Sequence, residues 1–131
     1  MQGIGSTGYK IKGNNMITKG IRGAITVEEN TVEAIQEATL DLFEQLVKRN
    51  NLTEENVSHI IFSTTKDIDT VYPAKFIRKD FGWNNTAFMC IQEMNVKNAL
   101  PMCIRILIVV NCNENFRPEY VYLKGATNLR T

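Results

Sequence analysis

The sequence predicts an α+β domain in which one long helix covers one face of a five-stranded sheet. One stretch, residues 30–49, has the apolar spacing of an amphipathic helix, and five others have the short apolar or alternating pattern of strands. The chain has 131 residues, of which 44% are apolar. That is enough for one domain with a real core and too little for two.

The chain opens on a stretch without periodicity. Residues 1–15 are rich in Gly, Ser and Asn, so we predict a flexible leader there and a single domain at residues 16–131. The leader could belong to the native protein or be an extension added before its start. The N-terminus lacks the basic-then-apolar pattern of a secretory signal. No apolar run approaches the roughly 20 residues needed to cross a bilayer.

The first predicted strand is Met16–Thr26, and its glycines are its main feature. Gly20 and Gly23 flank Arg22. Glycine inside a strand often marks a place where a ligand or another backbone comes close. Arg22 is therefore a candidate anion-binding residue, with an ordinary surface arginine as the open alternative.

The long helix begins at a sequence that resembles a capping box. Asn30 would supply the N-cap side chain and Glu33 stands at N3. The helix then runs to about Arg49, where Asn50 and Asn51 end it. Its apolar residues form one stripe at helical spacing, namely Ile35, Ala38, Leu42, Phe43, Leu46 and Val47. This stripe would cover one face of the sheet.

The rest of the chain alternates short elements with turns. Leu52–Asn56 is typical of a helical turn capped by Thr53. Pro73 stands at the first turn of a short helix, Ala74–Phe81, which Gly82 closes. The remaining predicted strands are Val57–Thr64, Thr86–Ile91, Met102–Cys112 and Glu119–Lys124. One long helix covers only one sheet face, so the second apolar face predicts oligomerisation.

The most informative residue is an arginine in the middle of an apolar strand. Alternation places Cys103, Arg105, Leu107 and Val109 on one face and the intervening aliphatic residues on the other. Burying an unpaired guanidinium costs several kcal/mol, so an anion must meet it. Glu93 is the nearest candidate partner. Two interpretations stay open: a structural ion pair, or a pair that faces a cavity and binds substrate.

Other polar residues on the strands and the short helix could contribute to a site. Lys75, Arg78 and Lys79 form a basic helix face, for which plain solvation is the alternative. Tyr122 would pack with its hydroxyl at the rim of a strand. Cys90 would need a nearby base or positive field to act as a nucleophile. Without a nucleophile–base pair, the set suits binding of a small dianion, with any catalysis by electrostatics and positioning.

Composition limits the function classes further. The net charge of +1 argues against nucleic acid or a membrane surface as the main partner. Three cysteines, Cys90, Cys103 and Cys112, have no C-x-x-C spacing, which favours reduced thiols in a cytoplasmic protein. With one histidine, His59, and no metal-ligand cluster, neither a metal site nor a histidine-based triad is expected.

At these residues the sequence resembles the AroH-class monofunctional chorismate mutases. The resemblance covers about Met16 to Arg130, and many short matches in the right order carry it. The matching segments are Lys19–Ala24 with Thr26–Glu28, Val71–Lys75 with Arg78, Gly82–Trp83, Cys90–Met94, Cys103–Arg105, Val121–Leu123 and Leu129–Arg130.

The resemblance implies a homotrimeric pseudo-barrel with a five-stranded mixed sheet in each subunit and active sites between subunits. It also implies an isomerase that converts chorismate to prephenate by a Claisen rearrangement, without cofactor or metal. Such an enzyme serves phenylalanine and tyrosine biosynthesis in the shikimate pathway, in the cytoplasm. The alternative is a non-catalytic trimeric module that binds a carboxylate metabolite in the same cleft.

Residue roles follow from the same resemblance. Arg105 would face the ether oxygen as it gains negative charge, and would also meet a substrate carboxylate. Glu93 would accept a hydrogen bond from the ring hydroxyl, with Cys90 close to the same hydroxyl. Arg22 and Tyr122 would hold the enolpyruvyl carboxylate. The further substrate-binding positions are Tyr72, Ala74, Lys75 and Arg78 from the neighbouring subunit, Met89, Ile91 and Gln92 beside Cys90, and Leu129 and Arg130 in a closing tail.

Three features depart from the family pattern. Met89 stands where the family often has a smaller polar residue, and Tyr72 stands where phenylalanine is usual. The tail after Gly125 is short for a lid. If lid closure matters, substrate affinity would suffer before turnover does.

Overall fold

A computed structural model describes the chain over residues 10–11 and 14–129. Its helices are α1 (Val32–Asn50) and α2 (Ala74–Asp80), with 3-10 turns η2 (Glu54–Asn56) and η3 (Lys124–Ala126). Its strands are β1 (Lys10–Ile11), β2 (Asn14–Thr26), β3 (Val57–Thr64), β4 (Ala87–Gln92), β5 (Cys103–Asn113) and β6 (Val121–Leu123). The predicted α+β class is confirmed.

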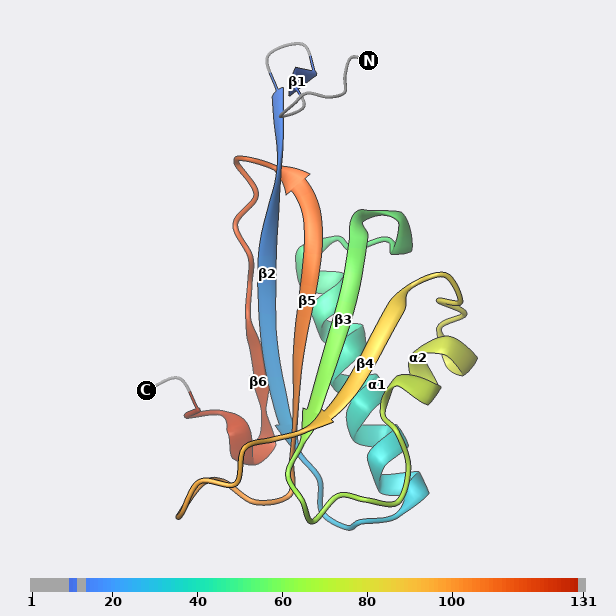
Figure 1. Ribbon diagram of the computed structural model, residues 1–131, viewed down its shortest axis with the longest axis vertical. Coiled ribbons are helices and arrows are strands. Elements are labelled where there is room, and N and C mark those ends of the chain that lie inside the picture. The colour runs from blue at the N-terminus through green and yellow to red at the C-terminus, as the bar shows by residue number, and fades with distance from the viewer. Residues whose placement is uncertain (1–9, 12–13, 130–131) are drawn as a thin grey trace.

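The sheet is mixed, as expected, and its main strands lie in the order β6-β2-β5-β3-β4. β5 is antiparallel to both β2 and β3, whereas β6 is parallel to β2 and β4 is parallel to β3. Figure 1 shows α1 lying across one face of this sheet and α2 beside the β4 edge. Among the described residues, no helix is both long enough and apolar enough to cross a membrane.

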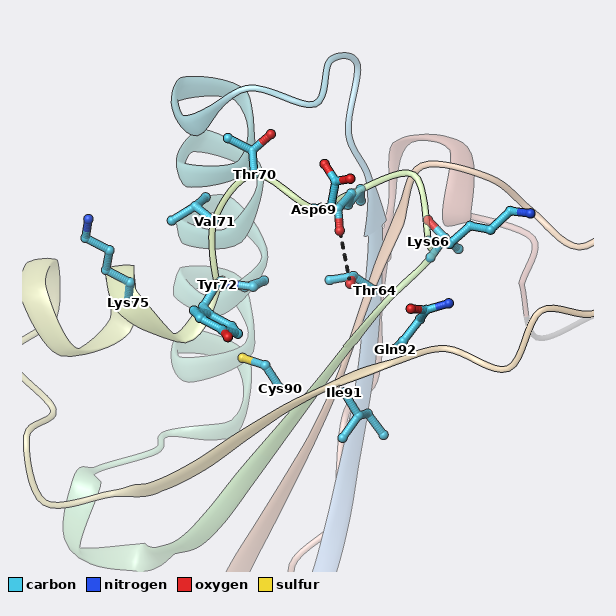
Figure 2. Close-up of a pocket in the computed structure, with 13 residues that line it drawn as sticks. Thr64, Lys66, Asp69, Thr70, Val71, Tyr72, Lys75, Cys90, Ile91 and Gln92 are labelled. Carbon is cyan, nitrogen blue, oxygen red and sulfur yellow. Dashed lines mark hydrogen bonds between the residues drawn. The ribbon is translucent and has the colours of Figure 1, made fainter.

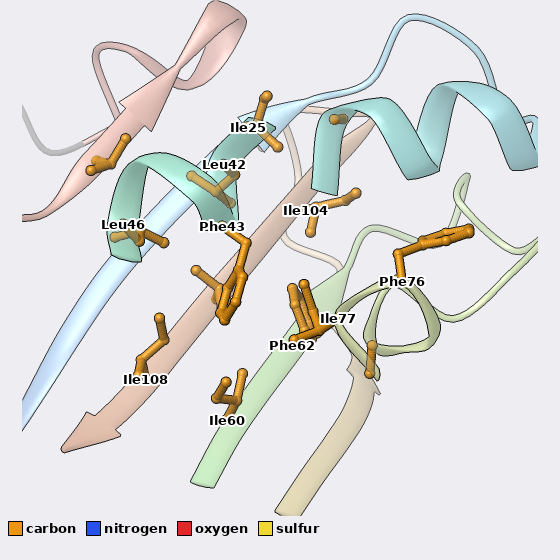
Figure 3. Close-up of a cluster of buried hydrophobic side chains, with 14 of the residues drawn as sticks. Ile25, Leu42, Phe43, Leu46, Ile60, Phe62, Phe76, Ile77, Ile104 and Ile108 are labelled. Carbon is orange, nitrogen blue, oxygen red and sulfur yellow. The ribbon is translucent and has the colours of Figure 1, made fainter. Parts of the chain in front are cut away.

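The core lies between α1 and the sheet. The predicted helix stripe is buried except for Val47, which is partly exposed. Leu42, Phe43 and Leu46 pack over isoleucines of three strands, including Ile25, Ile60 and Ile108 (Figure 3). Each such fully buried side chain contributes roughly 1.5–3 kcal/mol relative to an exposed one. These contacts fix α1 on the sheet and leave the opposite face without a helix.

The N-terminus of α1 differs from the prediction by one residue. The N-cap is Thr31, whose Oγ1 accepts a hydrogen bond from the Ala34 backbone N–H at 3.1 Å. The Asn30 side chain bonds instead to Asp69 and Thr70 in the loop before α2. The predicted capping box was therefore wrong, because that loop engages the Asn30 amide. Asn51, in the left-handed region at φ 52°, ends the helix as predicted.

β4 and β5 are each shifted by one residue from the prediction, and β2 and β6 each begin two residues from the predicted start. β2 begins at Asn14, and its first residues pair with β1 in a hairpin, so residues 10–11 and 14–15 belong to strands and not to a leader. Residues 1–9 and 12–13 lie outside the described residues, and the domain boundary stays a prediction. β6 covers only Val121–Leu123, since the Glu119 backbone bonds to the Asn50 side chain and not to the sheet.

Gly23 marks a close approach, as the sequence indicated. A Cβ at Gly23 would lie 3.0 Å from the Val121 carbonyl oxygen and 3.0 Å from a Leu46 methyl group. At Gly20 a Cβ would meet only a Leu107 methyl group, at 3.2 Å. Gly23 therefore allows β6 and α1 to pack closely against β2.

The alternation predicted for β5 is confirmed. Ile104, Ile106, Ile108 and Val110 are buried beneath α1. On the other face, which we call the open face, Arg105 and Val109 are half-buried and Leu107 is exposed. Cys103 is buried there, in a small cluster with Ala24 of β2 and Ala126 of η3.

Candidate active site

Strand register brings several candidate residues into one row across the open face. Arg105 pairs with Ala24 on one side and with Ser63 on the other. Ala24 pairs in turn with Tyr122 on β6, and Ser63 pairs with Ile91 on β4. Directly paired residues project from the same face of a sheet, so this row runs from Tyr122 to Ile91 with Arg105 at its centre. Arg22 lies on the same face, two residues before Ala24.

Glu93 reaches this row from just beyond β4. Its backbone N–H donates to the Thr64 carbonyl at 2.8 Å, which extends the pairing of β3 with β4 by one residue. Its Oε1 lies 3.7 Å from Arg105 Nε and accepts a hydrogen bond from Ser63 Oγ at 2.5 Å. Both charged side chains are about one-third exposed, at 33% for Arg105 and 28% for Glu93. The predicted pairing of Arg105 with Glu93 is thus confirmed.

This ion pair leaves part of the arginine unsatisfied. At 3.7 Å the contact is too long for a hydrogen bond, and Arg105 Nε is buried without a hydrogen-bond partner. The Tyr122 hydroxyl, at the other end of the row, is also buried without a partner. A buried polar group left unpaired costs about 1–3 kcal/mol, so each of these atoms is a site where an added acceptor would be favourable.

A cavity of about 390 Å³ lies on the open face over the part of this row that runs from Arg105 to Ile91. Its charged lining consists of Arg22, Arg105 and Glu93. Two guanidinium groups and one carboxylate leave an excess of positive charge, which favours an anionic ligand. The other lining residues are Ile61, Ser63, Ile91, Gln92, Met94, Ile106 and Leu107. The structural ion-pair interpretation is thus incomplete, because the pair faces a cavity.

A second cavity, of about 520 Å³, lies on the other side of β4, between that strand and the loop that leads to α2. Figure 2 shows Tyr72 and Cys90 pointing into this space from opposite walls, with Lys75 at one side. Tyr72 is 70% exposed, although it is a large aromatic side chain. Ile91 and Gln92 line both cavities. The expected site residues therefore fall into two groups on the two sides of one edge strand.

The thiols near the site stay protonated at neutral pH. Burial raises the pKa of the Cys90 thiol, and a backbone hydrogen bond from Ala74 and the charge of Arg78 offset this only in part. Burial also raises the pKa of the Cys103 thiol, against the opposing effect of Arg105. A thiol with a raised pKa is a poor nucleophile. Both cysteines therefore suit packing or weak hydrogen bonding better than covalent chemistry.

The remaining predicted positions, Tyr122 among them, lie outside the lining of both cavities. Ala74 is buried at the start of α2, and Arg78 lies over the Phe88 ring at 5.6 Å. Met89 is exposed on the open face, and Leu129 packs in the small cluster beside Tyr122. Arg130 lies outside the described residues.

Sequence reasoning did not identify Ser63. The signal was present, because alternation along Val57–Thr64 puts Ser63 opposite the buried positions Ile60 and Phe62. What the sequence could not provide was the register that places Ser63 beside Arg105. Two aspartates of the loop after β3 connect it to distant segments: Asp67 accepts from the Met102 backbone N–H, and Asp69 accepts from the Asn30 side-chain amide.

Comparisons with known proteins agree with one another. The family model described as chorismate mutase type I matches residues 18–131. Chorismate mutase AroH of Bacillus subtilis is 37% identical over 116 residues, covering 88% of this chain and 91% of that protein. Chorismate mutase AroH of Thermus thermophilus is 36% identical over 116 residues, covering 87% and 94%. A chorismate mutase structure from Clostridium thermocellum superposes with a TM-score of 0.80 at 39% identity, covering 84% and 98%.

Proposed function

This chain belongs to the chorismate mutase type I family and is an isomerase, and we propose that it rearranges chorismate to prephenate in the cleft around Arg22, Glu93 and Arg105. One observation carries the location: Arg105 Nε and the Tyr122 hydroxyl are buried and unpartnered in one row of the open face. Chorismate has two carboxylates, an ether oxygen and a ring hydroxyl. Its carboxylate and ether oxygens can accept hydrogen bonds from Arg105 and Tyr122, and its hydroxyl can donate one to Glu93.

Arg105 is the main electrostatic catalyst in this proposal. In the rearrangement the ether C–O bond lengthens, and its oxygen gains negative charge in the transition state. A guanidinium fixed on a central strand is already in place when that charge develops, so it stabilises the transition state more than the substrate. The unsatisfied Nε supports this role, because it leaves a donor free beside the Glu93 contact.

The other residues of the cleft bind and orient the substrate. Glu93 accepts a hydrogen bond from the ring hydroxyl. The Cys90 thiol lines the other cavity, so it comes close to the same hydroxyl only in the assembly proposed below. Arg22 and Tyr122 hold the enolpyruvyl carboxylate. Confinement of the folded, chair-like conformer then supplies positioning without any covalent intermediate. No cofactor or metal takes part in this scheme.

We further propose a homotrimer in which each active site lies between two subunits. The expected site residues lie in two groups on either side of β4, and neither cavity contains the whole set. Apolar side chains of the open face, including Leu107, Met89 and Ile91, are 37–59% exposed and would gain cover from a second copy. Tyr72, Ala74, Lys75 and Arg78 would then face the Arg105 group of the neighbouring subunit. Leu129 and Arg130 would close over the substrate.

The cytoplasmic location and the place in phenylalanine and tyrosine biosynthesis remain predictions. The first is supported by the cysteines, all three of which are free thiols.

The direct test is turnover by the purified protein with a chelator present. Loss of the ultraviolet absorbance of chorismate, with prephenate confirmed by NMR, is the expected result. No turnover by a folded protein would contradict the proposal and favour the binding-module alternative.

The relative affinity for two ligands separates enzyme from binding module. An enzyme should bind a bicyclic, oxa-bridged dicarboxylate that mimics the transition state at least about 10²-fold more tightly than prephenate, as measured by calorimetry. Similar affinities for the two ligands would indicate a general anion-binding module.

A further inference from the structure

Ser63 is a small polar residue on a central strand that no role in the proposed reaction yet includes. It lies on β3, in register with Arg105 of β5 and Ile91 of β4, and it lines the open-face cavity. We propose that Ser63 is a positioning residue, which holds the Glu93 carboxylate in the orientation that binds the ring hydroxyl of the substrate. This inference deepens the proposed function and rests on it.

The geometry assigns the two oxygens of Glu93 different tasks. Ser63 Oγ donates to Oε1 at 2.5 Å, and the same Oε1 lies 3.7 Å from Arg105 Nε. Within the described part of the chain, Oε2 has no hydrogen-bond partner. One oxygen is therefore held between a donor and a cation, and the other is available to the substrate hydroxyl.

Glu93 needs such a restraint because its own segment provides little. The residue lies one position beyond β4, with a single backbone bond to Thr64, and the next side chain, Met94, is 76% exposed. A glutamate has several rotatable bonds, and freezing them on substrate binding costs affinity. A donor on the neighbouring rigid strand orders the carboxylate before the substrate arrives.

The serine also limits how far the ion pair can close. A glutamate free to rotate could approach Arg105 and form a bidentate pair with its guanidinium. Such a pair would use the Arg105 donors that the transition state requires. Because Ser63 holds Oε1, the contact stays at 3.7 Å and Nε stays without a partner. Ser63 therefore affects catalysis through Glu93 and Arg105.

The test is a double-mutant cycle between Ser63 and Glu93. Ser63→Ala should lower both kcat/KM for chorismate and the affinity for the oxa-bridged dicarboxylate about tenfold, because a hydrogen bond to a charged group is lost. In a Glu93→Ala background the same serine substitution should change the affinity for the oxa-bridged dicarboxylate by no more than about twofold. Calorimetry makes the second measurement possible even where turnover is too slow to follow.

Two further variants separate positioning from a general structural effect. Ser63→Thr keeps the hydroxyl and should restore most of the activity. Ser58→Ala makes the same change on the same strand at an exposed residue whose hydroxyl contacts His59, and it should behave like the parent protein.

Each result decides between roles. Equal losses from Ser63→Ala with and without Glu93, or a Ser63→Ala variant as active as the parent, would overturn the positioning role while the parent still converts chorismate. Failure of both the parent and Ser58→Ala to convert chorismate would instead overturn the proposed function, and the Ser63 inference with it.

Discussion

The site depends on how individual side chains sit in an otherwise regular sheet. Arg105 could be singled out from the sequence because a cation in an apolar strand costs free energy unless an anion meets it. Glu93 and Arg22 could be proposed for similar reasons of charge and context. Ser63 could not, since a serine near the end of a strand is unremarkable until the register is known.

The Tyr122 hydroxyl should contribute binding energy that does not depend on the chemical step. It is buried without a partner, so a substrate carboxylate would be its acceptor. Tyr122→Phe should raise the KM for chorismate by about fivefold to tenfold with kcat nearly unchanged. This pattern is expected when a lost interaction had stabilised the bound substrate and the transition state equally. Steady-state kinetics measure this. A fall in kcat with unchanged KM would contradict the carboxylate-holding role.

Cys103 should make the folded state less stable in alkaline solution. Burial raises its pKa above the ordinary value of 9.0, so the folded protein holds the thiol proton more tightly than the unfolded chain does. That contribution is fully present below pH 9 and is lost as the pH rises through the folded-state pKa. Denaturant unfolding from pH 8 to 10.5 should therefore show a smaller decline in stability for Cys103→Ala than for the parent. Identical declines would contradict this account.

At the scale of elements, hydrophobic spacing was a reliable guide. The position of α1 and the faces of β5 followed from side-chain periodicity alone, because the period of 3.6 or 2 decides which residues can reach a core. The ends of elements were less predictable. The N-cap is Thr31 and not the predicted Asn30. The Asn30 amide bonds instead to Asp69, in a loop about 40 residues away in sequence.

The contact of β6 with β2 should depend on Gly23. A methyl group there would meet the Val121 carbonyl and Leu46 at 3.0 Å, and a backbone atom cannot move aside as a side chain can. Gly23→Ala should lower the free energy of unfolding by about 1–3 kcal/mol and weaken substrate binding, because β6 carries Tyr122. Chemical denaturation and the KM for chorismate measure these effects.

Gly20→Ala is the matched control for this substitution. Its methyl group would meet only the end of the Leu107 side chain, at 3.2 Å. Gly20→Ala should therefore lower the free energy of unfolding by much less than Gly23→Ala does. Equal destabilisation by both substitutions would show that an added methyl group at any point of this strand, and not the close approach of β6, is the cause.

At the scale of the whole molecule, one sheet face is covered by α1 and the other carries the candidate site. The uncovered face could be foreseen by counting helices, and it is the reason that a single chain was expected to be incomplete. The division of site residues into two cavities could not be foreseen. It depends on which side of β4 each side chain projects from, and only the fold determines that.

Sites shared between subunits should be restored by mixing two damaged chains. Arg105→Ala and Lys75→Ala damage different groups of the proposed interface. In randomly mixed trimers refolded from equal amounts, about a quarter of the sites would combine an intact Arg105 group with an intact Lys75 group. Activity should therefore rise to about a quarter of the parent value, well above that of either variant alone.

A second mixture provides the control. Arg105→Ala combined with Glu93→Ala damages the same group of residues in both chains, so mixing should restore no activity. If the first mixture shows no gain although sedimentation confirms mixed trimers, each active site lies within one chain and the proposed assembly is wrong.

The most direct test of the account is the rate of the Arg105→Ala variant with chorismate, measured alongside its mass in solution. Arg105→Ala should lower kcat/KM by at least about 10²–10³-fold, the loss seen when one preorganised donor to a developing oxyanion is removed, while the assembly stays folded and unchanged in size. Near-normal turnover by a folded Arg105→Ala variant would contradict it, because the charge on Arg105 would then not be what stabilises the transition state.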